Sequence, residues 1–353
     1  MTNIETTHLI ENTVVFDEAV NNTVNKSKPP NQESLCFIDL AEKWLRSEKL
    51  KTKESTFVQY NLILRNHIYP LLGKYLVIDI DRQTIEQTVI YYLSNGRLDG
   101  GGGLATKTTS DILMVIKSIF DYANQTGILS SLPTKGVCVK KRTKELCVLS
   151  LSEERALLLH LFNDTDLYKL GVLICLYTGI RIGELCALKW KNVCIDQRVI
   201  KIQHTMQRIS NLDLPTNEKT KIIVTEPKSQ SSIREIPIPS QLLSVLNLYA
   251  TVPEAYVLSG KTDQYIEPRT MQYRFKSYLK TLGLPNTNFH SLRHTFATRC
   301  VESGIDIKCL SEILGHATVN ITLNRYVHSS FDMKQKCIER IANFYDCSML
   351  GGS

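Results

Sequence analysis

The spacing of apolar positions predicts helices along most of the chain. Between residues 34 and 130, apolar side chains recur every three or four positions, which is the pattern of a helix with one buried face. This part is therefore expected to fold as one compact, all-helical domain. Its helices are expected from Ser34 onward, at about 55–69 where Pro70 ends the helix, and at about 83–94 and 105–126.

The rest of the chain combines helical and strand patterns. Short segments rich in Ile and Val, separated by polar loops, predict a small β-sheet. We therefore expect a mainly α-helical protein in which strands occur in the C-terminal domain. Helices are expected at about 152–163, 166–177, 181–188, 240–250, 269–282, 290–303, 306–314, 318–328 and 333–346, and strands at about 199–204, 221–225 and 233–237.

The charge distribution divides the chain further. The net charge is +7, yet residues 1–25 contain four acidic side chains and no Lys or Arg. Residues 135–145 hold five basic side chains and one acidic side chain, which is typical of an exposed linker that can contact a polyanion. We expect a flexible acidic tail, a helical domain, a basic linker and a second domain at 1–33, 34–132, 133–145 and 146–347.

Composition excludes several classes of protein. With 353 residues, 43% of them hydrophobic, the chain can bury a large core and is not a disordered chain or a disulfide scaffold. Ten cysteines without a CxxC pair indicate free thiols in a reducing compartment. The first 25 residues lack the features of a signal peptide, and the longest near-apolar run, 170–180, is too short to span a bilayer. We expect a cytoplasmic protein without membrane contact.

Two motifs in the second domain contain candidate site residues. Arg181 follows the turn glycine Gly179 at a predicted helix start, and Glu184 lies three positions on, where its carboxylate can hold the guanidinium. A surface ion pair would have the same spacing. Lys228 lies between two predicted strands, on an expected hairpin loop from which it can reach outward. A solvated turn lysine is the alternative there.

A third motif is the densest. His290, Arg293 and His294 share one face of a predicted helix, and His316 and Tyr326 follow. Four of the eight histidines lie between residues 290 and 328. A single histidine is often a partly buried residue with its hydrogen bonds satisfied. An arginine flanked by two histidines on one helix face is not explained by core packing alone. The cluster therefore favours a functional site.

Metal and nucleotide sites explain these residues less well. His290 and His294 have the spacing of two zinc ligands, but Ser291 stands where an HExxH motif needs Glu, and Arg293 would repel a cation. The four glycines at 100–103 lack the adjacent Gly-Lys-Ser/Thr of a phosphate-binding loop. We expect no metal and no cofactor.

The same residue types suit chemistry at a phosphodiester. Arginine forks match the non-bridging phosphate oxygens, and fixed cations stabilise the charge that develops there. A deprotonated tyrosine oxygen is a nucleophile, and nearby cations are expected to lower the pKa of that tyrosine. Lysine or histidine can donate a proton to the leaving alkoxide. Such a site needs no metal and conserves the bond energy in a phosphotyrosine.

Five motifs in this order resemble those of the tyrosine recombinases of the phage integrase family, most of all integrases of phages and conjugative transposons. They are Thr-Gly-Ile-Arg-Ile-Gly-Glu-Leu, Pro-Lys-Ser, His-Ser-Leu-Arg-His, Leu-Gly-His and Thr-Leu-Asn-Arg-Tyr. The resemblance covers roughly residues 34–346. It implies a SAM-like core-binding domain and a catalytic domain that close around duplex DNA as a C-shaped clamp.

The resemblance also implies a role for each site residue. Tyr326 would attack the scissile phosphate and form a 3′-phosphotyrosyl link without metal or ATP. Arg181 and Arg293 would clamp that phosphate, and Lys228 would protonate the 5′-oxygen. The remaining assignments are His290 as general acid/base, His316 as hydrogen-bond donor, Glu184 and His294 as supporting residues, and Lys135, Lys140, Lys141, Arg142 and Lys144 as DNA-binding linker cations.

The implied reaction is site-specific recombination that integrates or excises a mobile element. The implied partners are duplex DNA attachment sites, three further copies of the chain in a tetramer on synapsed DNA, and a directionality factor; free in solution the chain is expected to be a monomer or weak oligomer. The amphipathic end at 331–346 would dock on a neighbouring subunit or pack in cis. The short acidic segment before residue 34 argues against an arm-binding domain. The alternatives are a Xer-like resolvase, a type IB topoisomerase, and a catalytically degenerate DNA-binding regulator with a helix-turn-helix at 306–327.

Overall fold

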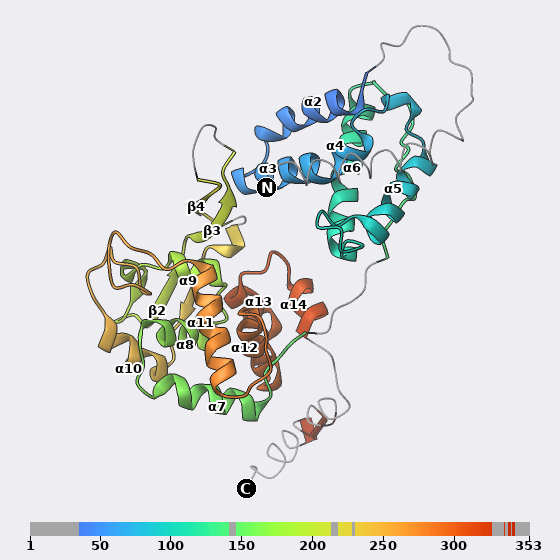
Figure 1. The fold of residues 1–353 in the computed structure, drawn as a ribbon. Coiled ribbons are helices and arrows are strands. Elements are labelled where there is room, and N and C mark those ends of the chain that lie inside the picture. Colours follow the sequence, from blue (N-terminus) through green and yellow to red (C-terminus); the bar gives the residue numbers. More distant parts are fainter. Residues whose placement is uncertain are drawn as a thin grey trace. The chain divides into compact units, whose positions relative to one another are not determined.

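The chain folds into two units, each with its own hydrophobic core (Figure 1). The computed structural model describes residues 35–140, 146–212, 218–227 and 230–326, together with residues 335, 338, 339, 341 and 342. The expected acidic tail, part of the basic linker, Lys228 and most of the expected last helix lie outside the described residues. Of the described residues, contacts assign those up to residue 140 and those within 209–219 to the first unit, and those within 146–208 and from 220 onward to the second.

The first unit is all-helical, as its sequence pattern predicts. Its core contains the apolar face of α2, including Phe37, which packs against Phe120 of α6 with ring centroids 5.4 Å apart. Val137 is also buried in this core, whereas Lys135 and Lys140 beside it are exposed. The helices are α2 (Phe37–Lys49), α3 (Glu54–Ile63), η1 (Leu64–Ile68), α4 (Tyr69–Leu72), η2 (Val77–Asp79), α5 (Arg82–Asn95) and α6 (Thr106–Gln125).

Pro70 does not end the second helix, so this detail of the sequence prediction is wrong. The helical path runs from α3 through the π-helical turn η1 into α4. The N–H of Tyr69 donates to the carbonyl of Leu64, five residues back, which closes the π-turn. Pro70 then occupies the first turn of α4, where a residue without an N–H is tolerated. The path ends at Gly73.

The second unit is mainly helical, with two small sheets. The apolar helix α8 lies in its core, and α7, α10 and α12 pack against it. No helix of the described residues has both the length and the apolar character that a membrane span requires. The helices are α7 (Leu151–Phe162), α8 (Leu167–Thr178), α9 (Ile182–Ala187), η3 (Trp190–Asn192), η4 (Gln230–Ser232), α10 (Ser240–Tyr249), α11 (Pro268–Thr281), α12 (His290–Glu302), α13 (Ile307–Leu314) and α14 (Val319–Tyr326).

Strand pairing in this unit differs from the expected hairpin. One sheet has the antiparallel order β1-β2-β5, with Val199 opposite Pro237 and Ile202 opposite Arg234. The other sheet pairs β3 with β4. The strands before and after Lys228 therefore belong to different sheets, and the segment between them is a connection between sheets rather than a hairpin loop. The strands are β1 (Val193–Cys194), β2 (Val199–Ile202), β3 (Thr205–Ser210), β4 (Thr220–Thr225) and β5 (Arg234–Pro237).

Candidate active site

Arg181 lies at the junction of α8 and α9. Gly179 ends α8 in the left-handed conformation, with φ of +65°, and Arg181 is the N-cap of α9. One turn on, Glu184 accepts from the Arg181 N–H at 2.9 Å and from Arg181 Nη1 at 2.8 Å. The Glu184 side chain is 3% exposed and that of Arg181 35% exposed. The carboxylate therefore holds the arginine from its buried side, as the spacing of the motif suggests.

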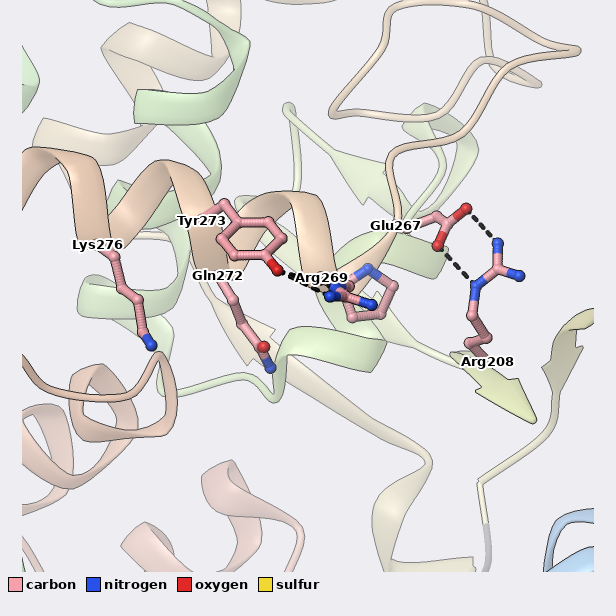
Figure 2. Close-up of a pocket in the computed structure, with 7 residues that line it drawn as sticks. Arg208, Glu267, Arg269, Gln272, Tyr273 and Lys276 are labelled. Carbon is pink, nitrogen blue, oxygen red and sulfur yellow. Dashed lines mark hydrogen bonds and ion pairs between the residues drawn. The ribbon is translucent and has the colours of Figure 1, made fainter. Parts of the chain in front are cut away.

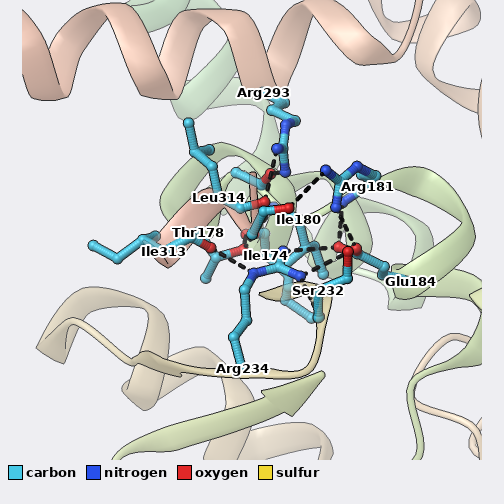
Figure 3. A network of polar contacts seen from close by, with 12 residues as sticks. Ile174, Thr178, Ile180, Arg181, Glu184, Ser232, Arg234, Arg293, Ile313 and Leu314 are labelled. Carbon is cyan, nitrogen blue, oxygen red and sulfur yellow. Dashed lines mark hydrogen bonds and ion pairs between the residues drawn. The ribbon is translucent and has the colours of Figure 1, made fainter. Parts of the chain in front are cut away.

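The C-terminal end of α13 brings three arginines together (Figure 3). The last carbonyls of a helix have no partner within the helix, and they carry the negative end of its dipole. Arg234 Nε donates to the carbonyl of Ile313 at 2.6 Å, Arg293 Nη2 to that of Leu314 at 2.7 Å, and Arg181 Nη2 to that of Gly315 at 3.1 Å. Three successive carbonyls thus offset the repulsion among three cations from distant parts of the sequence.

Gly315 makes this arrangement possible. It caps α13 with φ of +64°, a conformation that favours glycine. A Cβ at this position would lie 3.0 Å from Cδ and Nη1 of Arg234 and 3.0 Å from the carbonyl oxygen of Ser231. The turn can therefore pack against Arg234 because residue 315 has no side chain.

The histidine cluster surrounds a hollow of about 290 Å³. His290 begins α12, and its ring meets that of His294 edge-on at 4.6 Å. His316 follows the Gly315 turn, and its Nδ1 lies 2.8 Å from Oγ1 of Thr322. The hollow is lined by Arg181, Ser232, His290, Arg293, Gly315, His316, Ala317, Ile321 and Arg325. Motifs more than 100 residues apart thus converge on one polar site.

Tyr326, at the end of α14, lies beside this hollow with its side chain 6% exposed. Its hydroxyl is 2.9 Å from Nδ1 of His294. Its ring stacks on that of His316, with centroids 6.3 Å apart and an angle of 4° between the planes. His294, which the sequence places only as a supporting residue, is therefore the direct hydrogen-bond partner of the tyrosine.

The histidines of the site are neutral at pH 7. Burial, followed by the charges of neighbouring residues, lowers the pKa of His290 to about 4 and that of His294 to about 4. Burial and then the charges of Arg293 and Arg181 lower the pKa of His316 to about 3. A neutral imidazole has one donor and one acceptor nitrogen. Each ring can therefore donate one hydrogen bond and accept another, and its unprotonated nitrogen can take up a proton.

The tyrosine does not have the lowered pKa that its cationic surroundings suggest. Burial raises the pKa of Tyr326 above its usual value, and the charges of Arg293 and Arg325 oppose this without outweighing it. The expected cationic effect is present, but desolvation of the phenolate is larger. In the free protein the proton therefore stays on Tyr326.

Two arginines at the site received no role in the sequence analysis, and several candidates lie outside the described residues. The sequence analysis assigned no role to Arg234, because an arginine in a short predicted strand is expected to face solvent. In the structure its side chain is only 6% exposed. Arg325 likewise lines the hollow without an assigned role. Lys228 and three of the five linker cations (Lys141, Arg142 and Lys144) lie outside the described residues.

A second hollow, of about 380 Å³, lies along α11 (Figure 2). Arg269 donates to the hydroxyl of Tyr273 at 2.9 Å, and Arg208 pairs with Glu267. Gln272 and Lys276 continue the row along the helix. These side chains offer hydrogen-bond donors and acceptors suited to phosphate and base edges.

Comparison with known proteins places these features in one family. Residues 148–333 match the phage integrase family, and residues 36–93 match the N-terminal SAM-like domain of phage integrases. A tyrosine recombinase XerC-like protein of Caldanaerobacter subterraneus is 27% identical, over 87% of this chain and 83% of its own. The ICEBs1 integrase of Bacillus subtilis is 25% identical, over 86% and 81%.

Solved structures show the same fold. The Tn1549 transposon integrase in complex with transposon right end DNA aligns with a TM-score of 0.71 at 23% identity, over 87% of this chain and 100% of that one. A lambda integrase tetramer bound to a Holliday junction aligns with a TM-score of 0.60 at 16% identity, over 88% and 87%.

Proposed function

Because the chain belongs to the phage integrase family, we propose that it is a site-specific DNA recombinase whose nucleophile is Tyr326. The observation that carries the proposal is the convergence of Arg181, Arg293, His290 and His316 on one hollow beside that tyrosine. Among the described residues, the arginines that line the hollow, Arg181, Arg293 and Arg325, outnumber the carboxylate of Glu184 that pairs with Arg181. The site therefore suits an anion that gains further charge during reaction, as a phosphodiester does.

The proposed reaction conserves the energy of the phosphodiester bond. The Oη of Tyr326 attacks phosphorus, a new phosphorus–oxygen bond forms, and the bond from phosphorus to the 5′-oxygen breaks. DNA is left joined through its 3′-phosphate to the tyrosine, with a free 5′-hydroxyl. Attack by another 5′-hydroxyl reverses the step and rejoins the strand. The cycle accordingly calls for neither ATP nor a metal ion.

The arginines would bind the non-bridging oxygens of the scissile phosphate. Arg293 is 2% exposed and is fixed by the carbonyls of Gly179 and Leu314. Burial and the charge of Arg181 lower the pKa of Arg293 to about 9, so binding an anion relieves a real electrostatic cost. Pre-organised cations of this kind stabilise the transition state because they need no rearrangement when charge develops.

The proton transfers are assigned to the histidines around the hollow and to Lys228. Nδ1 of His294 lies 2.9 Å from the Tyr326 hydroxyl and is the proposed acceptor of its hydrogen bond, which would orient the nucleophile. His290 is the proposed general acid/base, and His316 the proposed donor to the phosphate, with its ring held by Thr322. Lys228 stays the proposed proton donor to the 5′-oxygen.

Duplex DNA is the proposed substrate, since the site acts on a phosphodiester and its surroundings are basic. The hollow along α11 and the exposed Lys135 and Lys140 are proposed DNA contacts. We further propose domains at 34–132 and 146–347, joined by a linker at 133–145. Recombination would take place in a homotetramer on synapsed DNA, in the cytosol. It would integrate or excise a mobile element with the help of a directionality factor.

The decisive experiment is covalent trapping. A nicked duplex with the end sequence of the element that encodes the chain is incubated with wild type, Tyr326→Phe and Tyr265→Phe. Tyr265 lies in the same unit and is 39% exposed, so its substitution controls for the loss of a hydroxyl. Wild type and Tyr265→Phe are expected to form a heat-stable protein–DNA band on a denaturing gel. Tyr326→Phe is expected to bind the duplex without forming the band.

Other outcomes point elsewhere. An adduct formed by Tyr326→Phe would refute the choice of nucleophile. DNA binding by wild type without any adduct would favour a regulator with a degenerate site. An adduct accompanied by relaxation of supercoiled DNA, but no exchange between two duplexes, would favour a topoisomerase.

A further inference from the structure

Arg234 is a buried cation whose guanidinium donates four hydrogen bonds. Its Nη1 and Nη2 donate to Oε1 and Oε2 of Glu184 at 3.1 and 2.8 Å, as a two-pronged pair. Its Nε donates to the carbonyl of Ile313, and Nη1 also donates to that of Ser232 at 3.0 Å. A buried ion pair is favourable only when its remaining donors are satisfied in this way. Arg234 is therefore a fixed part of the site's interior (Figure 3).

Glu184 is shared between two arginines of different exposure. The side chains of Arg234 and Glu184 are 6% and 3% exposed, and that of Arg181 is 35% exposed. Burial opposes ionisation of Glu184, but hydrogen bonds and charge from Arg234, followed by the charge of Arg181, lower its pKa. Arg234 is thus the larger stabiliser of the carboxylate. Because Arg234 also pairs with Glu184, Arg181 contributes more positive charge to the hollow than it would if it were the only partner of that carboxylate.

We propose that Arg234 is a positioning residue of the phosphate clamp formed by Arg181 and Arg293. Arg234 neutralises Glu184, so that Arg181 presents its charge to the scissile phosphate. The inference rests on the proposed function, since that phosphate is the anion to which the charge is presented. Arg234 acts through Arg181 and does not itself line the hollow. Its bond to the Ile313 carbonyl also steadies the turn that supplies carbonyl partners to Arg181 and Arg293.

Charge arithmetic makes the proposal testable. Arg181, Arg234, Arg293 and Glu184 together have a charge of 3 − 1 = +2. Arg234→Met lowers this to +1, because one cation is lost while Glu184 keeps its charge and is left to pair with Arg181 alone. The double variant Arg234→Met/Glu184→Gln returns it to +2 without restoring any bond made by Arg234. Recovery in the double variant would therefore reflect charge rather than structure.

The first readout does not depend on recombinase activity. Inorganic phosphate is titrated against each variant, and the rise in unfolding temperature reports anion binding. Wild type is expected to respond, Arg234→Met to lose at least half of the response, and the double variant to regain most of it. Arg299→Met is the matched control, because Arg299 is also partly buried, pairs with Glu154 at 2.7 Å and donates to the Leu149 carbonyl. It should respond like wild type.

The second readout is the single-turnover rate of covalent adduct formation. Arg234→Met is expected to react about 10- to 100-fold more slowly, and the double variant to recover about tenfold. A double variant that folds yet is no faster and no more responsive to phosphate than Arg234→Met would overturn the proposal. If Arg234→Met does not fold, Arg234→Lys replaces it; a folded lysine variant that has lost the phosphate response would overturn the proposal equally.

Failure of the proposed function would look different. Wild type would then form no adduct at all, whereas the phosphate titration would still report whether Arg234 controls the charge of Arg181.

Discussion

Substituting Gly315 by alanine should separate the organising role of the α13 turn from ordinary backbone strain. Gly315 and Gly283 have nearly the same backbone angle, φ of +64° and +65°. A Cβ at position 283 would meet nothing within 4 Å, whereas at position 315 it would meet Arg234 and the Ser231 carbonyl at 3.0 Å. The two alanine variants therefore share the strain but differ in the collision.

The expected magnitudes follow from this difference. An L-residue in the left-handed region costs about 1–2 kcal/mol, so Gly283→Ala should lose that much stability. Gly315→Ala should lose the same amount and about 1–3 kcal/mol more, because moving Arg234 weakens its bonds to Ile313 and Glu184. Misplacement of catalytic groups by about 1 Å can cost about 100-fold in rate. We expect a loss of that order in adduct formation for Gly315→Ala.

The assay combines urea unfolding of each variant with single-turnover cleavage of the nicked duplex. Gly283→Ala should cleave at the wild-type rate despite its lower stability. If Gly315→Ala matches Gly283→Ala in both stability and rate, the contact between the turn and Arg234 does not organise the site, and the reasoning fails.

Three further predictions concern the protons of the site. His294→Phe should bind DNA but form adduct at least about tenfold more slowly, because it leaves the buried Tyr326 hydroxyl without an acceptor. His294→Asn keeps an acceptor and should react at a rate nearer that of wild type in the same gel assay. Equal rates for the two variants would contradict this prediction. Lys228→Ala should slow cleavage of a normal 5′-oxygen but not of a 5′-bridging thiolate, which needs no proton, and parallel losses on the two substrates would exclude the general-acid role. Stability should fall between pH 6.5 and about 4, because His290, His294 and His316 take up protons in the unfolded chain before they do so in the folded one. The slope is at most about 1.4 kcal/mol per pH unit for each histidine, because solvent reaches part of these rings and screens their charge, and an unfolding free energy equal at pH 7 and pH 5 would contradict the prediction.

Local pattern was a sound guide to the helices. The spacing of apolar side chains predicted the helices of both units to within a few residues, because helix formation depends on neighbours three and four positions apart. Where a helix differs from the prediction, the cause is a local feature other than the spacing of apolar side chains. Pro70 was expected to end the helix. It is instead tolerated after a π-turn, where the following residue needs no N–H, and such a turn has no clear sequence signal.

Strand partners were harder to predict than strands. The segment 221–225 was correctly expected to be extended, but β4 pairs with β3 rather than with β5. Pairing depends on which edges the surrounding helices leave open, and a six-residue pattern does not contain that information. The expected hairpin around Lys228 was wrong for this reason.

Residue type and order alone predicted the chemistry proposed for this protein: two arginines, a lysine, histidines and a tyrosine in five motifs are the groups that phosphoryl transfer calls for. Tertiary structure decided how those groups are charged and held. The carbonyls at the end of α13 gather Arg181, Arg234 and Arg293, burial keeps the histidines neutral, and packing raises the pKa of Tyr326 where its cationic neighbours alone would lower it. Desolvation and hydrogen bonding act through space, so the burial that sets them appears only once the chain has folded.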